Sequence, residues 1–157
     1  AGLKVSDVDF NEKSFTVHNT KNKQPITLPM SDYTERLLLR RCEAAIDQYV
    51  FSGQQENKPI NDPRRQIAAV REESGVYFTH HDLRRTFISI AESLDISAYA
   101  VKKLVNHSTG GDVTAGYVIM DVERLRKPMQ QIADFLLKHA GIKSSAEIVS
   151  IDSSKEA

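Results

Sequence analysis

The sequence is poor in cysteine, with one residue of this type among 157. Cys42 lies in the stretch LLLRRCEAA, whose apolar residues have helical spacing. A buried structural thiol is the expected state for a cysteine in such a position. We therefore expect a cytosolic protein without disulfides.

Long hydrophobic runs are absent as well. No segment approaches the roughly 18 apolar residues that a membrane span requires, and no signal-peptide pattern opens the chain. Hydrophobic residues make up 40% and charged residues 27%, a balance typical of globular proteins. We expect one domain in the cytoplasm, without a membrane partner.

The chain has no excess of either charge, because 21 basic residues balance 21 acidic ones. DNA-binding domains often carry a basic excess, so composition alone does not suggest a nucleic-acid partner. It does not exclude one either, since affinity for DNA depends on how cations are arranged along one face. Motifs must decide the question.

Residues 5–30 have the pattern of a small β-sheet. The stretches VSDVDF, SFTVH and QPITLP alternate in polarity and are separated by the turn sequences NEK and NTKNK. We predict a three-stranded antiparallel sheet here. Asp32 and Glu35 then form a D-x-x-E capping pattern, and apolar residues at helical spacing predict a helix over 32–50.

The middle of the chain is predicted to be helical. Asp62, Pro63 and Gly75 suit the start and the end of one helix, which an extended segment, VYFT, follows. An apolar stripe predicts a helix over 81–94, and Ser97 can cap another that ends near residue 105.

The C-terminal part continues this pattern. After the loop HSTGGDV, TAGYVIM begins a short helix, and a last helix over 121–138 should kink or break at Pro128. The fold class is therefore α+β, mostly helical, with a small three-stranded antiparallel sheet near the N-terminus. Residues 1–140 form the domain, and 141–157, rich in Ser, Lys and Glu, form a flexible tail.

Three segments carry residues suited to chemistry on phosphate. In THHDLRRTF, His81 and Arg84 lie three apart and so share one face of a helix. In LVNHSTGGDVTAGYV, His107 precedes Tyr117 by ten residues, and Lys21 lies in the turn of VHNTKNKQPITLPMS. Each signal is weak alone, whereas the order Lys, His-x-x-Arg, His, Tyr is specific.

These segments resemble the catalytic domain of tyrosine recombinases of the phage-integrase type. HDLRRTF is similar to their HxLRRTF box, LVNHSTGGDVTAGYV to their histidine–tyrosine box, and TKNKQPITLPMS to the hairpin with their catalytic lysine. GLKVSDVDF resembles the segment that follows their first catalytic arginine. The resemblance spans residues 1 to about 139 and implies the catalytic set Tyr117, Arg84, His81, His107 and Lys21.

Two features depart from the family pattern. The R-x-x-E box with the first arginine lies a few residues upstream of the segment with which this sequence opens, and Asn106 stands where many members have glycine. The family's N-terminal DNA-clamping domain is not part of the sequence either. We therefore expect a fragment that is weakly active or inactive by itself.

The chemistry explains why these residue types are needed. A phenol with a pKa near 10 is only about 0.1% ionised at pH 7, so a base must take its proton during attack on phosphorus. His81 is the candidate base, and Lys21 is the candidate acid for the leaving sugar oxygen. Arg84 and His107 would stabilise charge on the phosphate oxygens, so that no metal or cofactor is required.

The resemblance also implies partners. Double-stranded DNA is the substrate, the working form is a homotetramer on DNA, and accessory DNA-bending proteins can take part. Prophage or genomic-island integration or excision is the expected role, at the bacterial nucleoid. Arg85, Lys102 and Lys103 are candidate DNA contacts, although a solvated helix face explains the lysines equally well. The same alternatives hold for Arg124, Arg126 and Lys127.

Three other interpretations stay open. ISIAESLDISAYAVKKLVNH resembles a helix-turn-helix, which would suit a non-catalytic DNA-binding regulator, although its turn lacks the expected glycine. A type IB topoisomerase would use similar residues to relax DNA. His80, His81 and His107 could also form a zinc site, but no suitable cysteine or carboxylate partner is defined.

Overall fold

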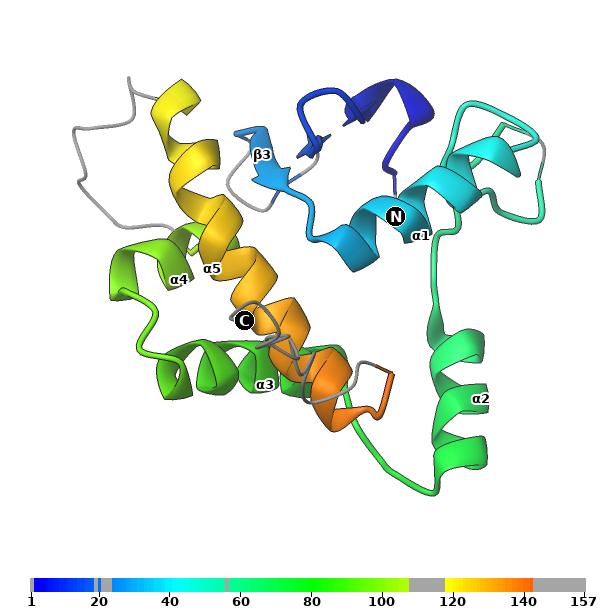
Figure 1. The fold of residues 1–157 in the computed structure, drawn as a ribbon. Coiled ribbons are helices and arrows are strands. Elements are labelled where there is room, and N and C mark those ends of the chain that lie inside the picture. Colours follow the sequence, from blue (N-terminus) through cyan, green and yellow to red (C-terminus); the bar gives the residue numbers. More distant parts are fainter. Residues whose placement is uncertain (1, 19, 21–23, 56, 108–117, 143–157) are drawn as a thin grey trace, which may run out of the picture.

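The computed structural model describes residues 2–18, 20, 24–55, 57–107 and 118–142. Within these residues the chain forms a small antiparallel sheet followed by five α-helices, as Figure 1 shows. The predicted α+β class, mostly helical with the sheet near the N-terminus, is confirmed. None of the helices described is long and apolar enough to cross a membrane.

The sheet consists of β1 (Val8–Asp9), β2 (Ser14–Val17) and β3 (Ile26–Pro29), paired in that order. In the β2–β3 pair, Thr16 lies opposite Thr27, and their hydroxyl oxygens are 2.9 Å apart. The sheet is therefore the one that the alternation predicts, with β2 in the middle.

The first predicted strand is shorter than expected. Val5–Asp7 form a 3-10 helix, η1, because the Asp7 carboxylate accepts a hydrogen bond of 2.9 Å from the Lys4 amide. This local contact competes with strand pairing for the backbone groups of these residues. Only Val8 and Asp9 are left for β1.

Helix α1 spans Asp32–Glu43, and its N-terminal cap lies one residue earlier than the D-x-x-E pattern predicts. The cap is Ser31, a buried residue whose hydroxyl oxygen accepts from the Thr34 amide at 3.2 Å. Asp32 is the first helical residue, where its negative charge is favourable beside the exposed amides of the helix start.

Helix α1 also ends at Glu43, so the predicted end at residue 50 is wrong. Beyond the helix, the chain pairs with the N-terminal segment: the Val5 amide donates to Gln48 O and the Val50 amide to Leu3 O, both at 3.0 Å. These contacts bury Val50. Apolar spacing alone could not reveal this competition, because the partner segment, residues 3–5, lies more than 40 residues away in the sequence.

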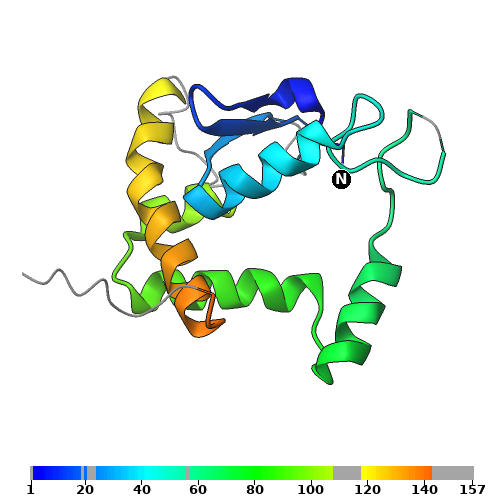
Figure 2. The same ribbon diagram turned by 45° about the vertical axis from the view of Figure 1, so that its right-hand side comes forward.

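Helix α2 (Arg64–Ser74) ends at Gly75 as predicted but begins one residue later than expected, because Pro63 is the cap and not the first helical residue. Asp62 accepts from the Arg64 amide at 3.0 Å, Pro63 occupies the cap position, and Gly75 ends the helix in a left-handed conformation (φ 67°). No residue of α2 is buried, and the helix stands away from the other elements in both Figure 1 and Figure 2. The following segment VYFT forms no strand.

The last three helices are α3 (His80–Ser93), α4 (Ala98–Leu104) and α5 (Val118–His139). The last is continuous through Pro128, so the predicted break and the separation into two helices are wrong. Leu125 and Ile132, on either side of the proline, are 3% and 1% exposed. Burial of two such side chains contributes about 3–6 kcal/mol, enough to offset a proline cost of about 3 kcal/mol.

Two hydrophobic clusters hold the fold together. The larger cluster joins α3, α4 and α5, and the smaller one lies between the sheet, α1 and the segment around Val50. Helix α5 contacts β3 as well as α3 and α4, and therefore links the two halves (Figure 1). The larger cluster consists of Ile90, Ala91, Ile96, Ala100, Val101, Leu104, Leu125 and Ile132.

Cys42 packs against the smaller cluster but is only half-buried. Burial nevertheless raises the pKa of its thiol. A raised pKa lowers the thiolate fraction at neutral pH, so the structural interpretation of this cysteine agrees with its surroundings.

Candidate active site

The first turn of α3, which carries His81 and Arg84, is fixed by a reciprocal capping box. The Thr79 hydroxyl oxygen accepts from the Asp82 amide at 3.2 Å, and the Asp82 carboxylate accepts from the Thr79 amide at 2.9 Å and its hydroxyl at 2.7 Å. These hydrogen bonds lower the pKa of Asp82; the bond from the Thr79 hydroxyl has the larger effect and the bond from the Thr79 amide the next. The sequence interpretation began the helix at residue 81 and missed this T-x-x-D box.

The segment that leads into α3 is anchored by a side chain of α2. The Arg71 guanidinium donates from Nε to the carbonyl oxygen of Phe78 at 2.7 Å, and a second nitrogen reaches the same oxygen. Its central carbon also lies 4.3 Å from the ring centroid of Tyr77. Arg71 thereby restrains the residue directly before the Thr79 cap, and with it the entry to the candidate site.

His81 and Arg84 are both exposed on the first two turns of α3. Among the residues that the structure describes, neither side chain forms a hydrogen bond or an ion pair. Arg85 differs, because its guanidinium lies 3.8 Å from the Asp82 carboxylate, although its side chain is 77% exposed. Within this part of the chain, no hydrogen bond or ion pair engages the two candidate catalytic groups.

His107 closes a Schellman motif at the C-terminal end of α4, three residues after Leu104. The His107 amide donates to Lys102 O at 2.8 Å, and the Asn106 amide donates to Lys103 O at 2.9 Å. Asn106 adopts φ 49°, a conformation that glycine and asparagine tolerate better than other residues. This explains why asparagine can stand here in place of glycine, and the motif sets the direction in which the exposed His107 leaves the helix.

Tyr117 and Lys21, the candidate nucleophile and the candidate acid, lie outside the described residues. Their neighbours are described: α5 begins at Val118, and β2 and β3 flank the turn that contains Lys21. His81 and Arg84 lie on α3, and His107 lies three residues after the end of α4; these two helices pack on each other and on α5. The structure therefore places three of the five predicted residues on one helical unit.

The DNA-binding candidates on α4 have different surroundings. Lys102 is exposed, whereas the Lys103 ammonium lies 5.7 Å from the ring centroid of Tyr99. Arg124, from α5, places its guanidinium 5.5 Å from the same ring. Two cations from different helices thus gather around one aromatic ring. The spacing of Tyr99 and Lys103, four residues apart on a helix, was the available sequence signal.

No metal site is present in the described part of the chain, where no group of three or more His, Cys, Asp or Glu side chains could hold an ion. His80 is near Asp62 at the start of α2: its charge is among the smaller influences that lower the pKa of Asp62, after the hydrogen bonds from Arg64. The three histidines considered for zinc are therefore not gathered in one cluster.

Comparison with known proteins places the chain among related sequences. Residues 1–124 match the model of the phage integrase family. The chain belongs to the phage integrase family. All five predicted catalytic residues fall within the matched range. The resemblance to tyrosine recombinases is thereby confirmed.

A curated relative points to the same family. The chain is 26% identical over 149 residues to the prophage integrase IntF of Escherichia coli (strain K12). This alignment covers 90% of the chain and 32% of the relative. The integrase-family chain thus spans about a third of the length of that protein.

The helix-turn-helix interpretation has a partial structural basis in this integrase-family chain. Helices α3 and α4 are joined by a four-residue turn, in which Asp95 adopts the left-handed conformation (φ 54°) expected of a glycine. Three of the seven residues of α4 are buried, namely Ala100, Val101 and Leu104. Few side chains remain on α4 for reading base edges.

The capping box makes a testable contribution to the site. Thr79→Ala should destabilise the protein by about 1 kcal/mol, because two hydrogen bonds at the start of α3 are lost. Chemical denaturation measures this change, and amide exchange over residues 80–83 should increase. The matched control is Thr86→Ala, an exposed threonine within α3, for which little destabilisation is expected. An equal effect of both substitutions would contradict a capping role.

Proposed function

We propose that this chain is the catalytic part of a site-specific DNA recombinase that cleaves and rejoins strands through a 3′-phosphotyrosine intermediate. The role would be to integrate or excise a prophage or a genomic island. The observation that carries the proposal is the family match over residues 1–124, which includes Lys21, His81, Arg84, His107 and Tyr117 in the family's order.

The first half-reaction exchanges one phosphoester bond for another. The Tyr117 oxygen attacks phosphorus, the bond from phosphorus to the 5′ sugar oxygen breaks, and the DNA 3′ end stays attached to the tyrosine. His81 takes the phenolic proton, and Lys21 gives a proton to the departing oxygen. Ionising tyrosine at pH 7 without such a base would cost about 4 kcal/mol.

The phosphate oxygens are stabilised by Arg84 and His107. The planar guanidinium of Arg84 can donate two hydrogen bonds to one phosphate, and His107 adds a further donor. Two features support this role. Both side chains are exposed, and each lies near a capping motif, which is the Thr79–Asp82 box for Arg84 and the Schellman motif after α4 for His107. Rigid mounting of this kind reduces reorganisation during the reaction.

The covalent intermediate determines the outcome. Because the phosphotyrosine ester conserves the bond energy, a free 5′ hydroxyl of a second DNA end can reverse the step and join a new partner. The proposal therefore includes duplex DNA as substrate, a homotetramer on DNA and accessory DNA-bending proteins, acting at the nucleoid in the cytoplasm. Residues 1–140 would form the catalytic domain and 141–157 a flexible tail, with no cofactor.

Basic side chains outside the catalytic set would hold the DNA. Lys102 is exposed on α4, and Arg85 is exposed on α3 with a long contact to Asp82. Lys103 shares the Tyr99 ring with Arg124, which extends the basic surface from α4 to α5. Contacts of this kind position the duplex without reading its sequence.

The decisive experiment is a covalent-adduct assay. The full-length protein that contains this chain should form an adduct that survives denaturation when it is incubated with a nicked suicide substrate of its attachment site. Absence of adduct with the full-length protein and its own site would refute the proposed function.

A second candidate, a non-catalytic regulator, is favoured by one observation, the helix-turn-helix arrangement of α3 and α4 with Asp95 in its turn. A regulator would bind its duplex without forming an adduct, and changes at Lys102 or Lys103 would relax its specificity. A topoisomerase would instead relax supercoiled plasmid without a defined site. The adduct assay on specific and non-specific DNA separates all three.

A further inference from the structure

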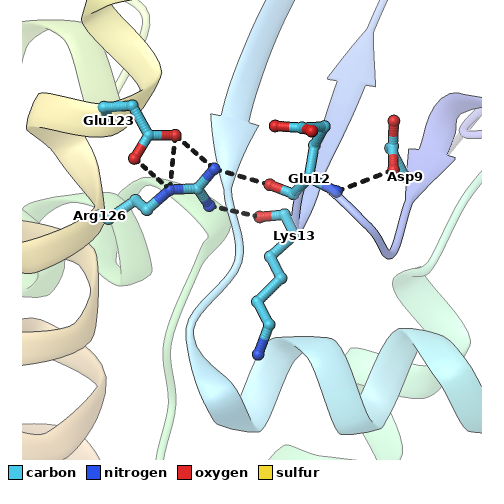
Figure 3. Close-up of polar contacts among 5 residues, drawn as sticks. All are labelled: Asp9, Glu12, Lys13, Glu123 and Arg126. Atoms are coloured by element: carbon cyan, nitrogen blue, oxygen red, sulfur yellow. Dashed lines mark hydrogen bonds and ion pairs between the residues drawn. The ribbon is translucent and has the colours of Figure 1, made fainter.

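Arg126, on α5, is not a solvated cation. Its side chain is 29% exposed, and each of its three guanidinium nitrogens forms hydrogen bonds, as Figure 3 shows. Nε donates to both carboxylate oxygens of Glu123 at 2.9 Å, and Nη2 donates to one of them at 2.6 Å. These bonds with Glu123 are the largest cause that raises the pKa of Arg126.

The remaining bonds of Arg126 reach the turn between β1 and β2. Nη2 donates to the carbonyl oxygen of Glu12 at 2.7 Å, and Nη1 donates to that of Lys13 at 3.2 Å. These partners precede Arg126 by more than 110 residues in the sequence. Four of the five guanidinium N–H groups are thereby used, so the side chain cannot donate two parallel hydrogen bonds to a DNA phosphate without releasing Glu123 or the turn.

The turn has a conformation that needs support. Lys13 adopts φ 44°, which is unfavourable for a residue with a side chain. The Asp9 carboxylate accepts from the amides of Asn11 and Glu12, both at 2.9 Å, and the Lys13 carbonyl also accepts from the Met30 amide at 2.8 Å. The carbonyls of residues 12 and 13 are thereby presented to α5.

The same turn is tied to α1, so that the contact extends beyond the sheet. The Lys13 ammonium lies 2.9 Å from the Glu35 carboxylate, which raises the pKa of Lys13. One turn beyond Arg126, Gln130 accepts from the Asp32 amide at 2.9 Å. Two side chains of α5 therefore join this helix to the half of the molecule that contains the sheet and α1.

The position of Arg126 along α5 makes these contacts relevant to the reaction. Helix α5 begins at the residue after Tyr117, and Arg126 lies eight residues further, or about 12 Å along the axis. Leu125 and Ile132 are buried on one side of the helix. Because apolar contacts are non-directional, they define the rotation and the axial position of the helix less sharply than hydrogen bonds do. Directional hydrogen bonds to two backbone carbonyls restrain both.

We propose that Arg126, oriented by Glu123, is a positioning residue for DNA cleavage. It couples the helix that follows the nucleophile to the sheet whose β2–β3 turn contains Lys21, and so sets the relation between the candidate nucleophile and acid. This inference rests on the proposed function. It assigns Arg126 a role that differs from a phosphate contact and from a solvated charge.

The test uses Arg126→Gln in the full-length protein, with Lys138→Gln, an exposed residue in the last turn of the same helix, as the charge-matched control. Arg126→Gln should slow adduct formation at saturating DNA by about tenfold or more, since small misplacements at a reacting centre are costly. DNA affinity should stay within about threefold, with an unchanged salt dependence. Lys138→Gln should leave the cleavage rate unchanged. The split between rate and affinity is the signature of positioning.

A conservative variant tests the same contacts if Arg126→Gln folds poorly. Arg126→Lys keeps the charge and can pair with Glu123, but one ammonium cannot hold both carbonyls in the same geometry. It should remain slower than the wild type by severalfold or more. A wild-type rate for either folded variant would overturn the proposal. So would weaker binding with a salt slope reduced by about one, which indicates a lost phosphate contact.

Hydrogen exchange separates this inference from the proposed function. Loss of the Arg126 contacts should increase exchange of the Met30 amide and of residues 10–14, whether or not the protein cleaves DNA. If the wild-type protein formed no adduct, the proposed function would fail. The exchange result would still report on the hydrogen bonds from Arg126 to the carbonyls of Glu12 and Lys13. Unchanged exchange in a folded Arg126→Gln variant would show that Arg126 does not stabilise the turn between β1 and β2.

Discussion

Replacing Tyr117 by phenylalanine should eliminate the covalent protein–DNA adduct, with a loss of cleavage rate of about 10⁴-fold or more. The substitution removes only the phenolic oxygen, which is the atom proposed to attack phosphorus. DNA binding should persist, because phosphate contacts from the basic side chains supply most of the affinity. Denaturing electrophoresis of the reaction on a nicked suicide substrate measures the adduct.

Tyr99→Phe is the matched control for this experiment. Tyr99 is an exposed tyrosine of α4, and phenylalanine keeps the ring beside Lys103 and Arg124. Its adduct yield should stay near that of the wild type. If Tyr117→Phe still formed the adduct, another residue would be the nucleophile and the assignment would be wrong.

Arg84→Ala should lower the cleavage rate by about 10²–10³-fold, the usual effect of removing one donor that stabilises charge in the transition state. Arg84→Lys should recover only part of this loss, because an ammonium cannot reproduce the two parallel hydrogen bonds of a guanidinium. Single-turnover cleavage at saturating DNA measures both variants.

The neighbouring arginine provides the control. Arg85 is 77% exposed and lies 3.8 Å from Asp82, so Arg85→Ala removes a positive charge from the same helix turn without touching the proposed phosphate donor. It should weaken DNA binding modestly and leave the cleavage rate within a few fold. Equal losses of rate for both alanine variants would show that Arg84 contributes only general positive charge.

Local sequence signals predicted some elements accurately. Helix α2 ends where Gly75 predicts and begins within one residue of the predicted start, because Asp62 and Gly75 contact backbone groups only two to four residues away. The order of the three strands followed from alternation and short connections, since consecutive strands joined by short connections usually pair. In these cases the partners that determine the structure lie close in sequence.

Predictions failed where distant partners compete with local preference. Helix α1 ends early because residues 48–50 pair with residues 3–5, and α5 passes through Pro128 because Leu125 and Ile132 are buried on both sides of it. The box between Thr79 and Asp82 is a different case. Its T-x-x-D pattern is local in sequence, so the start of α3 at His80 was predictable, and the expected start at residue 81 was one residue late.

The sequence by itself determined the family and the candidate catalytic set, because the order and spacing of reactive side chains are properties of the chain and need no coordinates. Only the tertiary structure decided what Arg126 does. A cation on a helix face can contact water, DNA or protein equally well, and the carbonyls of Glu12 and Lys13 that bind it become neighbours only after folding. Backbone acceptors leave no trace in the residue types, since every residue carries one.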